Sequence, residues 1–401
     1  MQSSYPTTTP PAMPPRDFLA EFEEAARAKV SELLQTYLEQ EADALLQRAR
    51  YQRREAGMPA AYRDGHDEPR PFTTSQGTLS IARPRIRGVA HDSSVVPRYQ
   101  RRAASLDTAM HALWIEGLAT RDVEPALRAL LGEQAPLSAA TVTRTNAKFF
   151  GDYDDWSKRS LADTEFVYLW LDGIFLGAGP DDERRVILTI LGADTNGTKH
   201  LLALRDAMSE SEISWSELFE DMKARGFKPP RLLIADGANG IWAAAEKSFP
   251  DARQQRCWFH KIKNVLDKVP KSKTDEVKTA LNEAMYSKTK ELCESRMVAL
   301  ATSLATGYPQ ASASVQEDLP RMFSFFAFPK HNWKSIRTSN PIESVFASVR
   351  LRTDAAKRMR TGASATYLVF ALIRRLSANW NRISGHKHIA AFIAAMGGVA
   401  A

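Results

Sequence analysis

The sequence predicts an α/β protein in which a mixed sheet carries helices on both faces, interrupted by an all-α insertion and preceded by a helical region. Three observations predict it. Apolar runs of strand length alternate with helical stretches between residues 165 and 270. Polar segments with helical periodicity follow at residues 271–335. Helical patterns also dominate residues 103–150.

The length and composition are those of an ordinary globular chain. The 401 residues correspond to roughly two or three domains. Apolar residues make up 44% of the chain and charged residues 25%. This composition excludes collagen, coiled-coil rods and wholesale disorder.

Nothing in the sequence predicts export or membrane insertion. The longest apolar run, residues 367–373, is far shorter than the roughly 20 residues that span a bilayer, and no apolar segment follows a basic start. The two cysteines, Cys257 and Cys293, cannot form a disulfide framework, which indicates a reducing compartment. We therefore expect a cytoplasmic protein.

Positive charge is concentrated in two stretches. Residues 330–387 contain twelve Lys or Arg against two acids, and residues 253–273 contain seven against one. Such a local excess attracts a polyanion by neutralising phosphates and releasing counterions. One such stretch could be a solvated face, but two in one chain favour nucleic acid as the partner.

The first 102 residues are predicted to comprise a short tail and a helical region. Residues 1–15 are rich in Pro, Thr and Ser and are expected to form a disordered tail. Residues 16–102 are expected to be helical and basic. Apolar positions at helical spacing between residues 17 and 54 predict a long amphipathic helix or a pair of helices, and residues 77–87 predict one short strand.

Residues 103–150 are predicted to form three helices. Thr120 and Ser138 are candidate caps of the second and third, and Gly132 ends the second. This order is typical of a helix-turn-helix, whose last helix enters a major groove, although a small helical bundle has the same pattern. The polar residues of the last helix that could face DNA are Thr141, Thr143, Arg144, Asn146 and Lys148.

The predicted sheet occupies residues 160–270. Three apolar runs, at 166–175, 185–192 and 199–204, have short connections and predict an antiparallel meander. A helix, a strand at 231–235, a helix, a strand at 252–257 and a further helix follow in the sequence. After the insertion, residues 336–401 are expected to complete this domain with basic helices.

Two aspartates are candidate site residues. Asp172 lies within the most hydrophobic predicted strand, where a carboxylate is costly unless it is paired or binds a cation. It could also be a satisfied core residue or mark a bulge. Asp236 follows the fourth predicted strand, at a sheet edge where sites form, although Asp-Gly after a strand is also an ordinary turn.

Glu343 is the third candidate acid. Asn340, Pro341 and Glu343 fit a capping box at a helix start, which would explain the acid without any functional role. Arg350 follows seven residues later, almost two helical turns further along nearly the same face. One face of this helix would then present an acid to a metal and a base to a phosphate.

These three acids, separated by 64 and 107 residues, reproduce the order found in the ribonuclease H-like DDE transposases. More closely, the chain resembles the Mutator-like (IS256-type) bacterial insertion-sequence transposases over residues 16–385. The likeness is carried by the stretches VPRYQRR (96–102), GLATRDV (117–123), LWLDGIFLG (169–177), LLIADGANGIWAAAEKSFPDARQQRCWFHKIKNVL (232–266) and TSNPIESVFASVRLRT (338–353).

The resemblance implies a ribonuclease H-like fold and a DNA transposase that binds terminal inverted repeats and catalyses Mg²⁺-dependent strand cleavage and strand transfer. It implies that Asp172, Asp236 and Glu343 are the catalytic residues and hold two Mg²⁺ ions, for which Mn²⁺ can substitute. One ion would activate water or a 3′-hydroxyl, and the other would stabilise the leaving oxygen.

Double-stranded DNA, as transposon ends and as target, is the implied partner of a nucleoid-associated homodimer, since paired element ends suit two-fold symmetry. The residues predicted to bind DNA are Arg350, Arg352, Lys357, Arg358, Arg360, Arg144, Lys148, Lys261 and Lys263. Two alternatives stay open at this stage: a catalytically inactive DNA-binding regulator, and a nuclease that cuts branched DNA without strand transfer.

The family also implies a Cys-x-x-His motif, which Cys257 and His260 match. Two soft ligands fall short of the four that structural zinc normally takes, so a packing or hydrogen-bonding role is favoured over zinc binding. Trp258, between them, could stack on an unpaired base or pack in the core, and packing is the preferred interpretation.

Overall fold

The computed structural model describes residues 17–132, 135, 137–176, 185–356 and 362–397. The chain divides into two compact units, Met1–Ala147 and Lys148–Ala401. The helices and strands of the first unit are α1 (Phe18–Leu46), β1 (Tyr62–His66), β2 (Arg70–Thr74), β3 (Gly77–Ile81), β4 (Pro84–Arg87), α2 (Ala104–Ile115), α3 (Thr120–Leu131) and α4 (Ala139–Lys148).

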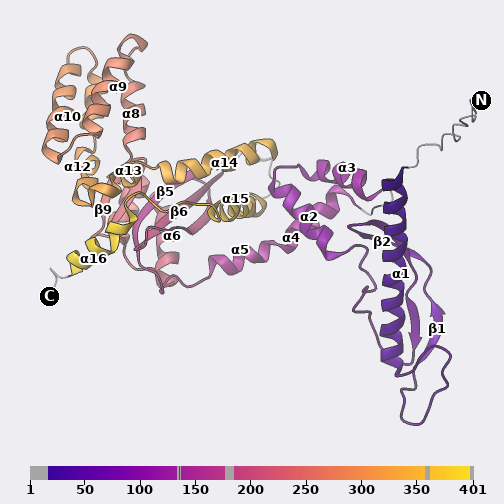
Figure 1. The fold of residues 1–401 in the computed structure, drawn as a ribbon. Coiled ribbons are helices and arrows are strands. Elements are labelled where there is room, and N and C mark those ends of the chain that lie inside the picture. Colours follow the sequence, from indigo (N-terminus) through magenta and orange to yellow (C-terminus); the bar gives the residue numbers. More distant parts are fainter. Residues whose placement is uncertain (1–16, 133–134, 136, 177–184, 357–361, 398–401) are drawn as a thin grey trace, which may run out of the picture. The chain divides into compact units, whose positions relative to one another are not determined.

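The long helix α1 packs on two small antiparallel ribbons (Figure 1). Leu38 of α1 shares a core with Phe72, Leu79 and Ile81. The ribbons pair β1 with β4 and β2 with β3. The short strand predicted within residues 77–87 is confirmed as β3, whereas the other three strands were not predicted. β1 was missed because its sequence, YRDGH, contains no buried residue and therefore lacks hydrophobic alternation.

The three helices predicted after residue 103 are confirmed as α2, α3 and α4. Met110, Val123, Leu127 and Val142 meet in their common core. Ser138 accepts a hydrogen bond from the backbone N–H of Thr141, as a cap should.

Two polar residues predicted to face DNA from α4 are instead buried. Thr141 and Asn146 are only 6% and 4% exposed. Asn146 forms a hydrogen bond with His111 of α2. Thr143, Arg144 and Lys148 are exposed on the same helix.

The second unit is built on a five-stranded mixed sheet with strand order β7-β6-β5-β8-β9 (Figure 1). β5, β6 and β7 form an antiparallel meander, and β8 and β9 run parallel to β5. The predicted order of strands and helices is therefore confirmed. The elements are α5 (Phe150–Ser157), β5 (Phe166–Leu176), β6 (Arg185–Asp194), β7 (Lys199–Ala207), α6 (Glu212–Ala224), β8 (Leu232–Ala235), α7 (Asn239–Ser248), β9 (Arg253–Arg256) and α8 (Trp258–Leu266).

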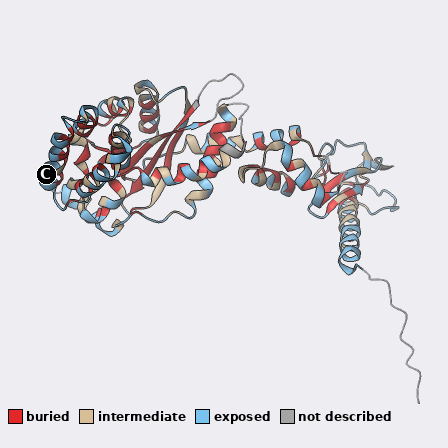
Figure 2. Ribbon diagram, turned by 90° about the horizontal axis from the view of Figure 1, so that it is seen from above, coloured by how far each residue is buried: buried red, intermediate tan, exposed pale blue. Residues whose placement is uncertain are grey.

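Helices cover both faces of this sheet, whose strands are buried along most of their length (Figure 2). Leu169 and Leu171 of β5 pack in one core with Trp215 of α6 and Trp242 of α7. The alternate residues of β5, which point to the opposite face of the sheet, contact the segment that precedes α14. Tyr168 donates a hydrogen bond to Asn332, and Trp170 donates to the carbonyl of Ser335.

Helices also make up the segment that follows α8, where α9 and α10 lie side by side. Its elements are α9 (Lys271–Met285), α10 (Lys290–Leu304), α11 (Pro309–Gln316), α12 (Leu319–Met322), η1 (Ser324–Ala327), η2 (Lys330–Asn332) and α13 (Trp333–Ile336). The last elements are α14 (Asn340–Ala356), α15 (Gly362–Ser377), η3 (His386–His388) and α16 (Ile389–Gly397).

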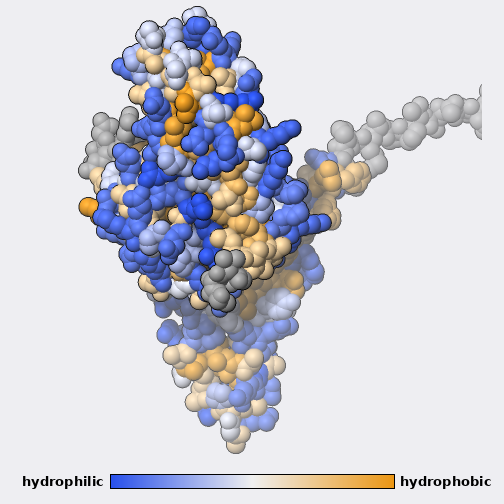
Figure 3. Space-filling model, turned by 90° about the vertical axis from the view of Figure 1, so that its left-hand side faces the viewer, coloured by the Kyte–Doolittle hydropathy of each residue, from blue (hydrophilic) through white to orange (hydrophobic). Residues whose placement is uncertain are grey.

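Hydrophilic side chains dominate the face of the molecule drawn in Figure 3, and hydrophobic ones form small separate patches there. Within the described part of the chain, no helix combines the length and the apolar character that crossing a bilayer would require.

Candidate active site

Asp172 of β5 lies level with Asp236, which directly follows the adjacent parallel strand β8. Trp170 of β5 is paired with Ile234 of β8, and each aspartate follows its member of this pair by two residues. Because residues two apart point to the same face of a strand, both carboxylates belong to the face of Trp170. The segment that precedes α14 covers this face.

The next strand, β9, adds a third residue beside Asp172 and Asp236. Ala235 is paired with Arg256, and the N–H of Cys257 donates to the carbonyl of Ala235 at 2.7 Å. Cys257 is therefore level with Asp236 and, like it, directly follows its strand at the same edge. The sheet thus presents Asp172, Asp236 and Cys257 in one row across three neighbouring strands.

Glu343, in the first turn of α14, is brought to the same site because α14 packs on β5. Burial raises the pKa of Asp172 to about 8, and the negative charges of Asp236, Glu210 and Glu343 contribute in the same direction. The carboxylates therefore repel one another within one partly buried volume. A cation at this place would relieve the repulsion.

The side chain of Glu343 does not act as the predicted capping box. α14 already includes Asn340, and the N–H of Glu343 donates to the carbonyl of Ser339 at 3.0 Å. The carboxylate accepts a hydrogen bond from the hydroxyl of Ser339. Instead of capping the helix, the carboxylate contacts the buried residues Ser339 and Cys257 and the partly exposed His260.

Cys257 and His260 belong to this contact. Glu343 Oε1 lies 3.5 Å from His260 Nδ1 and 3.9 Å from Cys257 Sγ. Ser339 Oγ lies 3.0 Å from the sulfur and 3.4 Å from Nδ1. Burial raises the pKa of the Cys257 thiol. The Cys-x-x-His motif thus has a specific partner, the third acid.

Trp258 packs in the core, as preferred from the sequence. It is fully buried, and its indole N–H donates to the carbonyl of Met322 at 3.1 Å. The alternative, that it stacks on a base of DNA, was wrong because neither ring face is accessible.

Glu210 is a fourth acid near the site that sequence reasoning missed. It lies between β7 and α6, and burial followed by the charge of Asp236 raises its pKa to about 7. A Cβ atom on Gly173 would lie 2.0 Å from Glu210 Oε1, so the absence of a side chain at position 173 gives this carboxylate room. No sequence motif marks Glu210, although its neighbour Ser211 is a recognisable N-cap.

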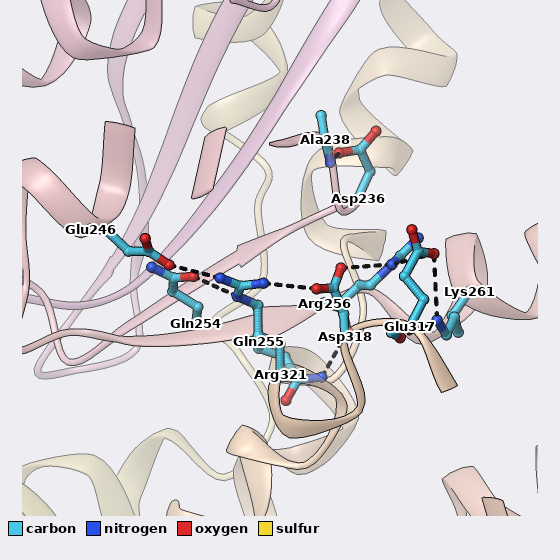
Figure 4. A network of polar contacts seen from close by, with 10 residues as sticks. All are labelled: Asp236, Ala238, Glu246, Gln254, Gln255, Arg256, Lys261, Glu317, Asp318 and Arg321. Carbon is cyan, nitrogen blue, oxygen red and sulfur yellow. Dashed lines mark hydrogen bonds and ion pairs between the residues drawn. The ribbon is translucent and has the colours of Figure 1, made fainter. Parts of the chain in front are cut away.

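A network of charges lies beneath Asp236 (Figure 4). Asp236 accepts a hydrogen bond from the N–H of Ala238, and Gly237 has φ +109. A Cβ on Gly237 would lie 2.5 Å from Nε of Arg256, so glycine allows the guanidinium to pack under the turn. Arg256 pairs with Asp318 at 2.7 Å and with Glu317 at 3.0 Å.

Lys261 belongs to this network, and its predicted contact with DNA was wrong. The side chain is fully buried and binds the backbone carbonyl of Glu317. Burial lowers its pKa to about 8. It lies in the basic stretch of residues 253–273, but its charge is directed inward.

The other basic candidates differ in accessibility. Arg350, Lys263, Arg144 and Lys148 are exposed, and Arg352 is half-exposed. Lys357, Arg358 and Arg360 lie outside the described residues.

Carboxylates gathered on one face of a mixed sheet, with an exposed arginine on the adjoining helix, are expected of an enzyme that acts on a phosphodiester backbone. The chain belongs to the Mutator family of transposases. The sequence model of that family matches residues 15–383.

Several relatives are transposases of bacterial insertion sequences. The transposase of IS6120 from Mycolicibacterium smegmatis is 38% identical over 71% of this chain and 87% of the relative. The transposase of IST2 from Acidithiobacillus ferrooxidans is 34% identical over 64% of this chain and 88% of the relative. The transposase of IS256 in transposon Tn4001 from Staphylococcus aureus is 26% identical over 79% of this chain and 82% of the relative. The resemblance drawn from the sequence is confirmed.

Proposed function

We propose that this transposase binds the terminal inverted repeats of an insertion sequence and catalyses Mg²⁺-dependent strand cleavage and strand transfer. The observation that carries the proposal is the parallel register that sets Asp172 level with Asp236 on the face next to Glu343. It supports a DDE site on a ribonuclease H-like sheet.

The donor set fits Mg²⁺. All three side chains offer the hard oxygen atoms that Mg²⁺ prefers. Asp172 can ionise fully near neutral pH only if a neighbouring positive charge offsets its burial and the other carboxylates. We propose that Asp172, Asp236 and Glu343 would hold the metal, which, when bound, activates the attacking oxygen and stabilises the leaving one. Mn²⁺ would substitute.

The sheet and α14 position the residues proposed to act on DNA. The two aspartates are fixed by the sheet, whereas Glu343 is carried on α14 with Arg350 seven residues further on. Arg350 is exposed and would bind a phosphate of the DNA backbone. Arg144 and Lys148, which are exposed on α4, would contact the double-stranded element ends. We expect a nucleoid-associated homodimer, because two ends must be processed together.

The test uses the purified full-length protein and a duplex that carries one element end from the inverted repeats flanking the gene. With Mg²⁺ we expect cleaved and joined DNA strands. Asp172→Asn, Asp236→Asn and Glu343→Gln should each lower the rate about 10²-fold or more, since each removes a metal ligand. Glu217→Gln, an exposed acid of α6 paired with Arg205, is the matched control and should cut normally.

The outcomes separate the alternatives. Salt-sensitive DNA binding without cleavage in Mg²⁺ or Mn²⁺ would identify a regulator. Cleavage without joined products would identify a nuclease. Normal cleavage by all three acid variants would remove the site assignment altogether.

A further inference from the structure

Ser339 lies at the centre of a small group of side chains that includes the Cys-x-x-His motif. It is fully buried, and its hydroxyl oxygen lies 3.0 Å from Cys257 Sγ and 3.4 Å from His260 Nδ1. Its backbone N–H also donates to the sulfur at 3.2 Å. The same hydroxyl contacts Glu343 Oε1.

A hydroxyl has one proton to donate and two lone pairs that accept. A carboxylate is the stronger acceptor, so the proton of Ser339 goes to Glu343. The S–H of Cys257 then donates to Glu343 Oε1, 3.9 Å away, and His260, in the tautomer that carries a proton on Nδ1, can donate to the hydroxyl oxygen. Every group of this cluster is satisfied in that arrangement, with Glu343 as its final acceptor.

Glu343 is held through Oε1. Within the described part of the chain, this oxygen makes the contacts of the carboxylate with Cys257, His260 and Ser339. Glu343 has three rotatable side-chain bonds, and ordering such a side chain costs conformational entropy. Holding Oε1 orders the side chain before any ligand binds and leaves Oε2 available.

We propose that Cys257, His260 and Ser339 are positioning residues that hold Glu343 by one oxygen, so that the other oxygen is presented to the metal. The inference rests on the proposed function, because it concerns the third acid of that site. It gives the Cys-x-x-His motif a role without requiring that the motif touch DNA or metal.

The backbone supports the same role. Cys257 is level with Asp236 at the end of β9, and the N–H of Trp258 donates to the carbonyl of Arg337 at 3.1 Å. The start of α8 is therefore bonded both to the strand next to Asp236 and to the segment that leads to Glu343. This connection fixes the distance between acids that are 107 residues apart in the chain.

A soft metal ion is the competing occupant of this cluster. One ligand atom from each of Cys257, His260 and Glu343 lies within 4.8 Å of the others, and three protein ligands are enough for an open zinc site. However, the Ser339 hydroxyl already lies among these atoms, within hydrogen-bonding distance of sulfur, nitrogen and oxygen. The arrangement therefore favours hydrogen bonding over metal ligation.

The experiment compares Ser339→Ala with Ser339→Thr, and His260→Ala with His260→Asn, in the full-length protein. Mn²⁺ binding is measured by calorimetry and electron paramagnetic resonance, and cleavage is measured across a Mg²⁺ titration. Loss of a residue that orients a metal ligand typically lowers metal affinity or activity 10- to 100-fold. We expect losses of about that size for both alanine variants, with unchanged DNA affinity, and recovery to within about 3-fold in Ser339→Thr and His260→Asn.

Ser344→Ala, which removes the neighbouring exposed serine of α14, is the matched control and should behave as the wild type. A double-mutant comparison tests whether the effect passes through Glu343. In Glu343→Gln, adding Ser339→Ala should change Mn²⁺ affinity no further. A merely structural role would give additive losses, which would overturn the proposal.

Other results would also overturn it. One is an Mn²⁺ affinity in both alanine variants that equals that of the wild type. The other is an absorption spectrum of the Co²⁺-loaded protein typical of tetrahedral coordination, with a sulfur-to-metal charge-transfer band that Cys257→Ser removes. The second result would identify a soft-metal site instead. If Asp172→Asn abolishes cleavage while Ser339→Ala and His260→Ala leave it unchanged, only the positioning role fails. If Asp172→Asn cleaves normally, the proposed function itself fails.

Discussion

Asp172 is held at an energetic cost to the fold. Burial is the main reason that its pKa rises to about 8, and the charges of three neighbouring acids add to it. An acid whose pKa is raised on folding favours the protonated folded state. The contribution of Asp172 to stability without metal is therefore greatest below about pH 4, the pKa of Asp in an unfolded chain, and falls as the pH rises toward 8.

Asp172→Asn should therefore stabilise the metal-free protein while it abolishes cleavage. At pH 8 we expect a gain on the order of 2 kcal/mol and a rise of a few degrees in Tm. The gain should shrink at pH 5, where the wild-type carboxyl is already protonated in the folded state. Thermal unfolding in EDTA at both pH values measures this, and a Tm below that of the wild type at pH 8 would contradict it.

At the scale of elements, β9 and the start of α8 connect three parts of the second unit. Arg256 packs beneath the turn after Asp236 and pairs with Glu317 and Asp318 of the helical segment. Cys257, the next residue, contacts Ser339. β9 and the start of α8 are thus joined to the rest of the second unit by polar contacts.

Arg256→Met should destabilise the second unit by about 2 kcal/mol. Removing one partner of a buried ion pair usually costs about 3–5 kcal/mol, but Glu317 is exposed and Asp318 keeps its bond to Arg321, which reduces the loss. Urea unfolding measures the change. The control, Arg253→Met, alters an exposed residue of the same strand and should shift stability by less than about 0.5 kcal/mol.

Elements with a hydrophobic pattern were predictable, and those defined by polar contacts were not. The apolar run that begins at Phe166 predicted β5, and its order with the later strands and helices predicted the α/β sheet. β1 carries no such pattern. Lys261 was assigned to DNA because sequence counts its charge but does not show that α8 turns it inward toward Glu317.

The three acids were predicted in sequence, but their surroundings were not. Nothing in the order of residues shows that Ser339 meets Cys257, because the two are 82 residues apart and come together only through tertiary packing. Glu210 was missed for the same reason. Its place depends on the space above Gly173, which is a property of the folded sheet.

At the scale of the whole molecule, the two units have separate hydrophobic cores. Met110 and Leu127 belong to a core of the first unit, and Leu169 and Trp215 belong to the core of the second. Chains built from several such units commonly unfold in more than one step.

Met110→Ala should therefore lower one calorimetric transition and leave the other in place. The side chain is fully buried, and truncations of this kind cost about 2–5 kcal/mol. Differential scanning calorimetry measures both transitions. A single transition that shifts as a whole would show that the units unfold cooperatively.

The position of Glu343 in the chain also has a consequence during synthesis. The first unit ends at Ala147, and Glu343 is translated 196 residues later. At about 5–20 residues per second, ribosomes take roughly 10–40 s to cover that interval. The helices proposed to bind the element ends can therefore be complete in a nascent chain well before Glu343 is synthesised. Attachment to DNA can then precede the ability to cut it.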